Sequence, residues 1–166
     1  MAWEQAAYDG LQDASIDTVA YLPDSFVSPL IDLVEDDPAI DTIRVTREES
    51  AVSILAGTWL GGSRGALVCQ SSGLANAFNA LGSHTVPGGL PFVGLVTRRG
   101  DLGDHNGAQV PAGYGMPRML DAIGVRNRHL EPADDAREVV AAACETSFST
   151  HSPYVLLLAS TLRGEE

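Results

Sequence analysis

Two adjacent glutamates, Glu48 and Glu49, have the residue type for acid–base chemistry. At helical spacing from Glu48, the residues on the same face are all apolar: Val52, Leu55, Ala56 and Trp59. A carboxylate that continues the buried face of a helix is costly to bury unless a hydrogen-bond donor meets it. We therefore predict that Glu48 faces a ligand or another chain. The alternative is a surface position beside the positive end of the helix dipole.

The second glutamate has a different expected role. Thr46 and Glu49 have the spacing of a capping box, in which each side chain bonds to the other residue's backbone amide. This pattern predicts a helix over residues 47–60 that ends at Gly61 and Gly62. Glu49 is therefore predicted to be structural.

A turn of small residues follows a later apolar segment. Gln70, Ser71, Ser72 and Gly73 form a strand end and a turn, and Asn76 lies in the helix that begins there. Backbone amides at such a turn can bind an anion or a ligand ring, and glycine permits close approach of the backbone. The alternative is an ordinary turn in which Ser72 caps the helix.

A glycine-rich stretch over residues 98–111 carries the third set of candidate side chains. Arg98 and Arg99 follow a predicted strand, where a pair of cations suits a carboxylate, sulfonate or phosphate. The alternative is that both arginines pair with the acidic surface. His105 beside Asp104 has the residue types of an acid/base pair, or the two belong to a solvated loop.

The composition limits the partners of the chain. Its 166 residues include 10 Lys and Arg against 22 Asp and Glu, a net charge of −12, and every cation is an arginine. An anionic surface of this kind repels phosphate backbones and acidic membranes, so we expect no nucleic-acid or membrane partner. The apolar runs are far shorter than the roughly 20 residues of a membrane span, and we predict a soluble, cytoplasmic protein. The lysine-free acidic surface suits a high-salt cytoplasm, where screening removes self-repulsion.

Several common catalytic motifs are absent from the sequence. There is no GxGxxG, GxxxxGK[ST] or GxSxG, so dinucleotide binding, P-loop phosphoryl transfer and α/β-hydrolase chemistry lose their main support. Cys69 and Cys144 each lie in an apolar segment, with no CxxC or Cys/His cluster. We therefore expect no metal ligands on this chain.

Hydrophobic patterning predicts the elements that position these side chains. Apolar runs predict strands over residues 17–22, 41–45, 66–70, 91–97 and 154–160. Helical patterns predict helices over residues 2–14, from Asp24 or Ser25 to 34, 47–60, 73–82, 117–123 and 133–148. Continuous apolar strands alternating with helices predict one α/β domain over residues 1–166, a doubly wound parallel sheet with helices on both faces. The strand-to-helix turns then meet at one edge of the sheet, where such sheets bind ligands.

The order of these motifs resembles a known family. The run from Thr46 to Gly57, the run over residues 70–81, Arg99-Gly100-Asp101 and the run over residues 108–111 are similar to the pyrimidine-binding domain of thiamine diphosphate enzymes. Within that superfamily the chain most resembles the alpha subunit of sulfopyruvate decarboxylase and the related half of phosphonopyruvate decarboxylase. Pro23-Asp24-Ser25 also fits, so the resemblance covers residues from about 17 to about 160.

The resemblance implies a thiamine diphosphate-binding fold and specific residue roles. The family's invariant glutamate lies nine residues before a glycine; here Gly57 selects Glu48, which would bond N1′ of the cofactor's aminopyrimidine. The resemblance implies that the cofactor is bound by Glu48, Gln70, Ser71, Ser72, Gly73 and Asn76. It implies that the substrate side of the site includes Asp24, Ser25, Asn79, Arg99, His105 and Gln109. The reaction would be decarboxylation of a 2-oxo acid to an aldehyde, within coenzyme M biosynthesis.

One half of such an enzyme is missing from the sequence. The family holds the diphosphate and Mg²⁺ through a GDG motif and a downstream Asn, whereas Gly100-Asp101-Leu102 lacks the last glycine and no strand is predicted at Asn127. The resemblance therefore implies a beta subunit that binds Mg²⁺ and the diphosphate, in a hetero-oligomer, with a homo-oligomer left open for the isolated chain. The substrate is left open among sulfonated, phosphonated and plain 2-oxo acids. The alternatives are a non-catalytic ligand-binding or regulatory domain and a thiamine-dependent synthase subunit.

Overall fold

A computed structural model describes residues 2–163 of the chain as alternating strands and helices. The strands are β1 Thr18–Tyr21, β2 Asp41–Arg44, β3 Gly65–Gln70, β4 Val93–Thr97, β5 Arg126–Leu130 and β6 Tyr154–Leu158. The longer helices are α1 Trp3–Asp13, α2 Ser28–Glu35, α3 Glu48–Leu60, α4 Ser71–Asn76, α7 Val110–Ala122 and α8 Ala136–Thr150. Short turns of helix complete the chain: α5 Phe78–Ala80, a π-helical segment Leu81–Thr85, α6 Val86–Gly88 and a 3-10 segment Ser160–Arg163.

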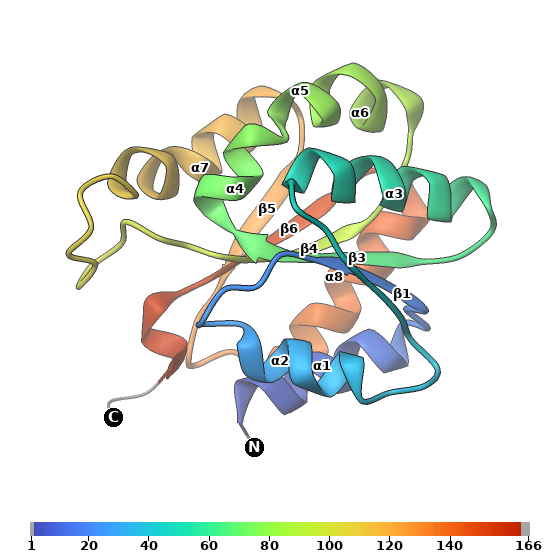
Figure 1. The fold of residues 1–166 in the computed structure, drawn as a ribbon, viewed down its shortest axis with the longest axis horizontal. Helices are drawn as coiled ribbons and strands as arrows, with labels where there is room; N and C mark the ends of the chain where they lie inside the picture. The colour runs from blue at the N-terminus through green and yellow to red at the C-terminus, as the bar shows by residue number, and fades with distance from the viewer. Residues whose placement is uncertain (1, 164–166) are drawn as a thin grey trace.

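The six strands form one parallel sheet covered by helices on both faces. Its strand order is β2-β1-β3-β4-β6-β5. Helices α1, α2 and α8 cover one face, and α3 to α7 cover the other (Figure 1). The predicted fold class, a doubly wound α/β sheet, is therefore confirmed.

Alternation along the strands supplies both hydrophobic cores. In β3, Ala66 and Val68 pack into the core under α1, α2 and α8, whereas Leu67 and Cys69 pack into the core under α3 to α7. All four side chains are fully buried. Successive side chains of a strand point to opposite faces, and burial on both faces requires the near-continuous apolar runs seen in the sequence.

The register of the sheet brings the ends of three strands to one edge. Gln70 at the end of β3 pairs with Thr97 at the end of β4, and Tyr21 at the end of β1 pairs with Val68. The turns after β3 and β4 therefore begin at the same level of the sheet, and the turn after β1 begins two residues below them, at the same edge. This is the edge at which the sequence places its candidate side chains.

One strand was not predicted. β5 has the sequence RNRHL with four positions partly or largely exposed at the edge of the sheet, so it lacks the apolar run that identifies a buried strand. Asn127 therefore lies on a strand, contrary to the sequence interpretation. Its side-chain amide donates to Asp121 Oδ1 at 2.9 Å and so binds the end of α7.

Three helix boundaries also differ from the prediction. α2 begins at Ser28, not at Asp24 or Ser25, and Val27 is its N-cap. α7 begins at Val110, seven residues earlier than predicted. The prediction missed its first part because the glycines there and Pro117 disfavour a helix. The helix expected over residues 73–82 begins at Ser71 and then breaks into short segments, including the π-helical turn.

No helix among residues 2–163 combines the length and apolar character that a membrane span requires.

Gly10 sets the distance between α1 and α8. A Cβ atom at Gly10 would lie 2.7 Å from the Arg137 carbonyl oxygen and 2.9 Å from Val140 Cβ, so the two helices touch at this point. We expect Gly10→Ala to lower the free energy of unfolding by about 1–3 kcal/mol, because the helices must move apart. Gly57 of α3 has open space around its Cα, so Gly57→Ala is the matched control and is expected to leave stability unchanged or to raise it by about 0.5–1 kcal/mol. Urea unfolding measures both; equal effects of the two substitutions would contradict this packing.

Candidate cofactor and substrate site

Glu48 is the first residue of α3 and is buried. Its exposed fraction is 8%, and Val52, Leu55 and Ala56 below it on the same face are buried, as the helical spacing predicts. Within residues 2–163 no side-chain hydrogen bond or ion pair reaches the Glu48 carboxylate. The alternative of a surface position is therefore wrong. An ionisable group buried without a partner is costly, which points to a ligand or another chain.

The capping box is not formed. Arg47, not Thr46, is the N-cap of α3, and it makes no side-chain capping bond. Glu49 instead accepts a hydrogen bond from Arg47 Nε at 2.7 Å on the exposed surface. Glu49 is thus turned away from the buried face, and Glu48 alone of the two enters it.

Gly73 makes room for the Glu48 carboxylate. A Cβ atom at Gly73 would lie 1.7 Å from Glu48 Oε1 and 2.2 Å from Cδ, a distance that no side chain permits. Ser72, the preceding residue, has a buried hydroxyl oxygen that finds no hydrogen-bond partner in the described part of the chain. The alternative role of Ser72 as helix cap is wrong, because Gln70 is the N-cap of α4. The Glu48 carboxylate at the start of α3 and the Ser72 hydroxyl in the first turn of α4 are therefore two polar groups without a partner in the described part of the chain.

Asp24 and Arg99 form a second polar cluster at this edge. Arg99 Nη2 donates to Asp24 Oδ2 at 2.7 Å, and the Asp24 side chain is only 6% exposed. Thr97 Oγ1 and the backbone N–H of Phe26 both donate to Asp24 Oδ1, at 3.2 and 3.0 Å. The backbone N–H of Arg99 donates to Ser71 Oγ at 3.1 Å, and Ser71 is fully buried.

The two clusters lie close to one another. Burial raises the pKa of the Cys69 thiol well above its ordinary value, and the negative charges of Glu48 and Asp24 raise it further. Both carboxylates are therefore near Cys69, at the end of β3. Ser71 bonds to Arg99 and Gly73 contacts Glu48, so a single three-residue turn connects them.

The loop over residues 98–109 is held by its own contacts. Asp104 accepts hydrogen bonds from the backbone N–H groups of Gly100 and Asn106, and these two bonds lower the pKa of its carboxyl group. Arg98 pairs with Asp101 at 2.8 Å, as the alternative predicts, but its side chain is only 12% exposed, so this ion pair is partly buried and not on the open acidic surface. His105 is exposed and makes no side-chain bond to Asp104 in residues 2–163, so the expected acid/base pair is not formed.

The remaining predicted site residues are placed less closely. Gln109 Nε2 lies 3.5 Å from Gln70 Oε1, which joins α7 to the end of β3. Ser25, Asn76 and Asn79 are exposed. Asn79 lines a groove between α3 and the π-helical segment, away from the Asp24 cluster.

Two residues of the site were missed by the sequence interpretation. Thr97 binds Asp24, and Gly113 of α7 lies against Arg99, where a Cβ atom would be 1.4 Å from the Arg99 carbonyl oxygen. A glycine inside a helix is a signal of close packing, but the helix itself was not predicted there. Thr97 gives no sequence signal, since it continues an apolar strand.

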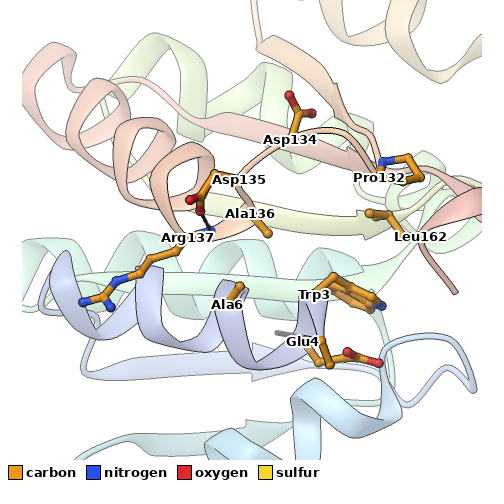
Figure 2. A pocket seen from close by; sticks show the side chains of 10 residues that line it. Trp3, Glu4, Ala6, Pro132, Asp134, Asp135, Ala136, Arg137 and Leu162 are labelled. Carbon is orange, nitrogen blue, oxygen red and sulfur yellow. Dashed lines mark hydrogen bonds between the residues drawn. The ribbon is translucent and has the colours of Figure 1, made fainter. Parts of the chain in front are cut away.

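A cavity of about 700 Å³ lies elsewhere on the molecule (Figure 2). It opens between the starts of α1 and α8 and the 3-10 segment, with Trp3 and Glu4 on one side and Pro132 and Leu162 on the other. Neither Glu48 nor Arg99 lines it. Among residues 2–163 no group of three or more His, Cys, Asp or Glu side chains is arranged to hold a metal ion.

Relatives with assigned activities cover nearly the whole chain. Sulfopyruvate decarboxylase subunit alpha of Methanococcus maripaludis is 31% identical over 154 residues, which is 93% of this chain and 92% of the relative. The same subunit of Methanocaldococcus jannaschii is 31% identical, with 92% and 90% covered. Phosphonopyruvate decarboxylase of Streptomyces viridochromogenes is 34% identical over 95% of this chain, but the match covers 40% of that enzyme.

A solved structure confirms the fold. The 2-oxoglutarate:ferredoxin oxidoreductase from Magnetococcus marinus superposes with a TM-score of 0.74 at 14% identity, over 98% of this chain and 29% of that one. No protein-family model matches the chain. The shared fold is a doubly wound α/β domain. By sequence, the chain belongs to the family of sulfopyruvate decarboxylase alpha subunits.

Both cysteine thiols are expected to be unreactive in the folded chain. Burial raises the pKa of Cys144 to about 12 and that of Cys69 well above its ordinary value, so neither forms the nucleophilic thiolate near neutral pH. A thiol reagent at about pH 8 should label no cysteine in the native chain and both after unfolding. Fast labelling of Cys69 in the native chain would contradict its burial beneath the two carboxylates.

Proposed function

We propose that this chain is the alpha, pyrimidine-binding subunit of a thiamine diphosphate-dependent decarboxylase that releases carbon dioxide from an anionic 2-oxo acid and forms an aldehyde. The observation that carries the proposal is the Glu48 carboxylate, buried against Gly73 without a partner. The names of the relatives support it, since they are sulfopyruvate and phosphonopyruvate decarboxylases. The expected cytoplasmic location and place in coenzyme M biosynthesis belong to the same proposal.

The residues of the site fit the aminopyrimidine ring of the cofactor. Glu48 offers an unpartnered acceptor, Ser72 an unpartnered hydroxyl, and Gly73 a face without a side chain. In this proposal the three residues hold the edge and one face of the ring. When bound, thiamine diphosphate supplies the electron sink that lets a 2-oxo acid lose carbon dioxide.

The chain itself contributes position and charge. Glu48 holds a proton between its carboxylate and the ring nitrogen, and the apolar residues beneath it keep water away from that hydrogen bond. Because α3 is anchored by Val52 and Leu55 in the core, the carboxylate has a fixed direction before any ligand arrives. The fully buried Ser71 keeps the turn in place by its bond to Arg99.

The cofactor's diphosphate and Mg²⁺ are proposed to be bound by a beta subunit. The closely similar methanogen proteins are named as alpha subunits, which implies a second kind of subunit. This chain matches 40% of the length of the single-chain phosphonopyruvate decarboxylase, so in that enzyme the remaining length is available for the complementary domain. A site closed by two chains explains why the Glu48 carboxylate lacks a partner within this one.

The Glu48→Gln substitution tests the proposed function. With the partner subunit present, we expect activity on sulfopyruvate to fall by about 100-fold or more, because an amide cannot hold the proton at the ring nitrogen. In the isolated chain the same substitution should change the free energy of unfolding by less than about 1 kcal/mol, because Gln keeps the shape of the side chain and the Glu48 oxygens are not fully enclosed. Thermal unfolding and decarboxylation assays measure the two effects.

Glu49→Gln is the matched control. Glu49 makes an exposed ion pair with Arg47, so the substitution should leave activity unchanged and alter stability by less than about 1 kcal/mol. A Glu48→Gln enzyme with normal activity would exclude the proposed cofactor site. Products that join two carbonyl compounds, in place of a simple aldehyde, would favour a synthase.

The acidic surface is proposed to be an adaptation to high salt. At a net charge of −12 the folded chain repels itself, and raising the ionic strength from about 0.1 to 1 M shortens the Debye length from about 10 to 3 Å. We expect the melting temperature to rise as potassium chloride is added over this range. A melting temperature that falls with salt would contradict this adaptation.

A further inference from the structure

We propose that Arg99 binds the second anionic group of the 2-oxo acid, and that Asp24 is a positioning residue that orients the Arg99 guanidinium. The inference rests on the proposed function and names the part of the site that selects the substrate. It also gives a specific role to Asp24, which the resemblance placed on the substrate side of the site. Four hydrogen bonds and two backbone contacts carry the argument.

Both carboxylate oxygens of Asp24 accept hydrogen bonds from within the chain. Oδ1 accepts from the Phe26 backbone N–H at 3.0 Å and from Thr97 Oγ1 at 3.2 Å, and Oδ2 accepts from Arg99 Nη2 at 2.7 Å. The side chain is 6% exposed. A carboxylate fixed in this way by three donors is suited to hold a cation in one direction and poorly suited to exchange protons with a substrate.

Most side-chain hydrogen-bond donors of Arg99 are unused. Of its five side-chain N–H donors, the bond to Asp24 uses one, and Nε is buried without a partner in the described part of the chain. The side chain is 28% exposed, so the chain itself leaves part of it uncovered. A planar fork held at one end by a carboxylate presents its other end to an anion in a fixed geometry, as a sulfonate, phosphonate or carboxylate requires.

The backbone of Arg99 is held at the edge of the cofactor site. Its N–H donates to Ser71 Oγ at 3.1 Å, and its carbonyl oxygen lies so close to Gly113 that a Cβ atom there would be 1.4 Å away. Ser71 begins the same turn whose Gly73 contacts Glu48. Arg99, through its backbone, and Glu48, through its side chain, thus both contact the first turn of α4, which places the two residues at one edge of the sheet.

Charge explains why a cation is needed at this point. Glu48 and Asp24 place two carboxylates at an edge that must receive a substrate with two negative groups. Arg98 and Arg99 each form one ion pair, with Asp101 and Asp24, but Arg98 Nε also donates to the Gly113 carbonyl oxygen, whereas Arg99 Nε is buried without a partner in the described part of the chain. The relatives' substrates, sulfopyruvate and phosphonopyruvate by name, share a 2-oxo acid with a second anionic group. That shared chemistry is the ligand class we assign to Arg99.

The test compares two substrates in the complete complex with the partner subunit. Sulfopyruvate carries the second anion, and pyruvate has the same ketone and carboxylate without it. We expect Arg99→Met to lower kcat/KM for sulfopyruvate by about 100-fold, mainly through KM, and to change kcat/KM for pyruvate by less than about 3-fold. 3-Sulfopropionate has both anionic groups but no ketone, so it binds without being decarboxylated. In Arg99→Met its inhibition should weaken by a similar factor, whereas inhibition by propionate should not change.

Asp24→Asn separates positioning from proton transfer. The amide keeps the shape and loses the charge that holds the guanidinium, so we expect a loss of about 10-fold that is confined to sulfopyruvate, with the pH profile for pyruvate unchanged. Arg99→Lys keeps the charge and loses the fork, and should recover part of the Arg99→Met loss. Arg98→Gln, which breaks the pair with Asp101, is the control with normal preference for sulfopyruvate.

The outcomes distinguish this inference from the proposed function. A wild-type complex that decarboxylates neither substrate contradicts the proposed function. A wild-type complex that is active, with Arg99→Met retaining the full preference for sulfopyruvate, overturns the role of Arg99 alone. Equal losses on both substrates in Asp24→Asn, with one limb of the pH profile removed, would make Asp24 a proton-transfer group and overturn its positioning role.

Discussion

The structure depends on one unfavourable contact, the burial of the Glu48 carboxylate against Gly73 with no hydrogen-bond donor from the described part of the chain. Removing a carboxylate from most of its contact with water is unfavourable unless a hydrogen-bond donor compensates it. The apolar residues of α3 below Glu48 anchor the helix in the core, so the side chain cannot turn outward without losing that packing. A ligand that donates a hydrogen bond at this point recovers the cost, and this couples the stability of the fold to its function.

The parallel sheet supplies the geometry around that contact. β3 and β4 end at the same level and β1 ends two residues below them, so the turns that follow these strands bring Asp24, Ser71 and Arg99 together although they are up to 75 residues apart. Glycines make the close approaches possible: Gly73 at the carboxylate and Gly113 at the Arg99 carbonyl. The edge therefore holds carboxylates and a guanidinium at fixed positions before a ligand is present. Fixed charges of this kind are the condition for electrostatic preorganisation.

Much of this arrangement was predictable from local patterns, and the failures have physical causes. Helical spacing identified the buried face of Glu48, and apolar runs identified five of the six strands. β5 was missed because an edge strand is exposed and charged. The capping box failed because Glu49 pairs with Arg47 on the surface. The hydrogen bonds of Asp24 to Thr97 and Arg99 join distant segments, and no local pattern carries that information.

The most direct measurement of the central claim is an experimental structure of the complex of this chain with its partner subunit and thiamine diphosphate. The account predicts that a Glu48 oxygen lies within hydrogen-bonding distance, about 2.6–3.2 Å, of N1′ of the aminopyrimidine, with the ring against Gly73. A structure in which the Glu48 carboxylate pairs with a side chain of the partner subunit, and the pyrimidine lies elsewhere, would contradict it.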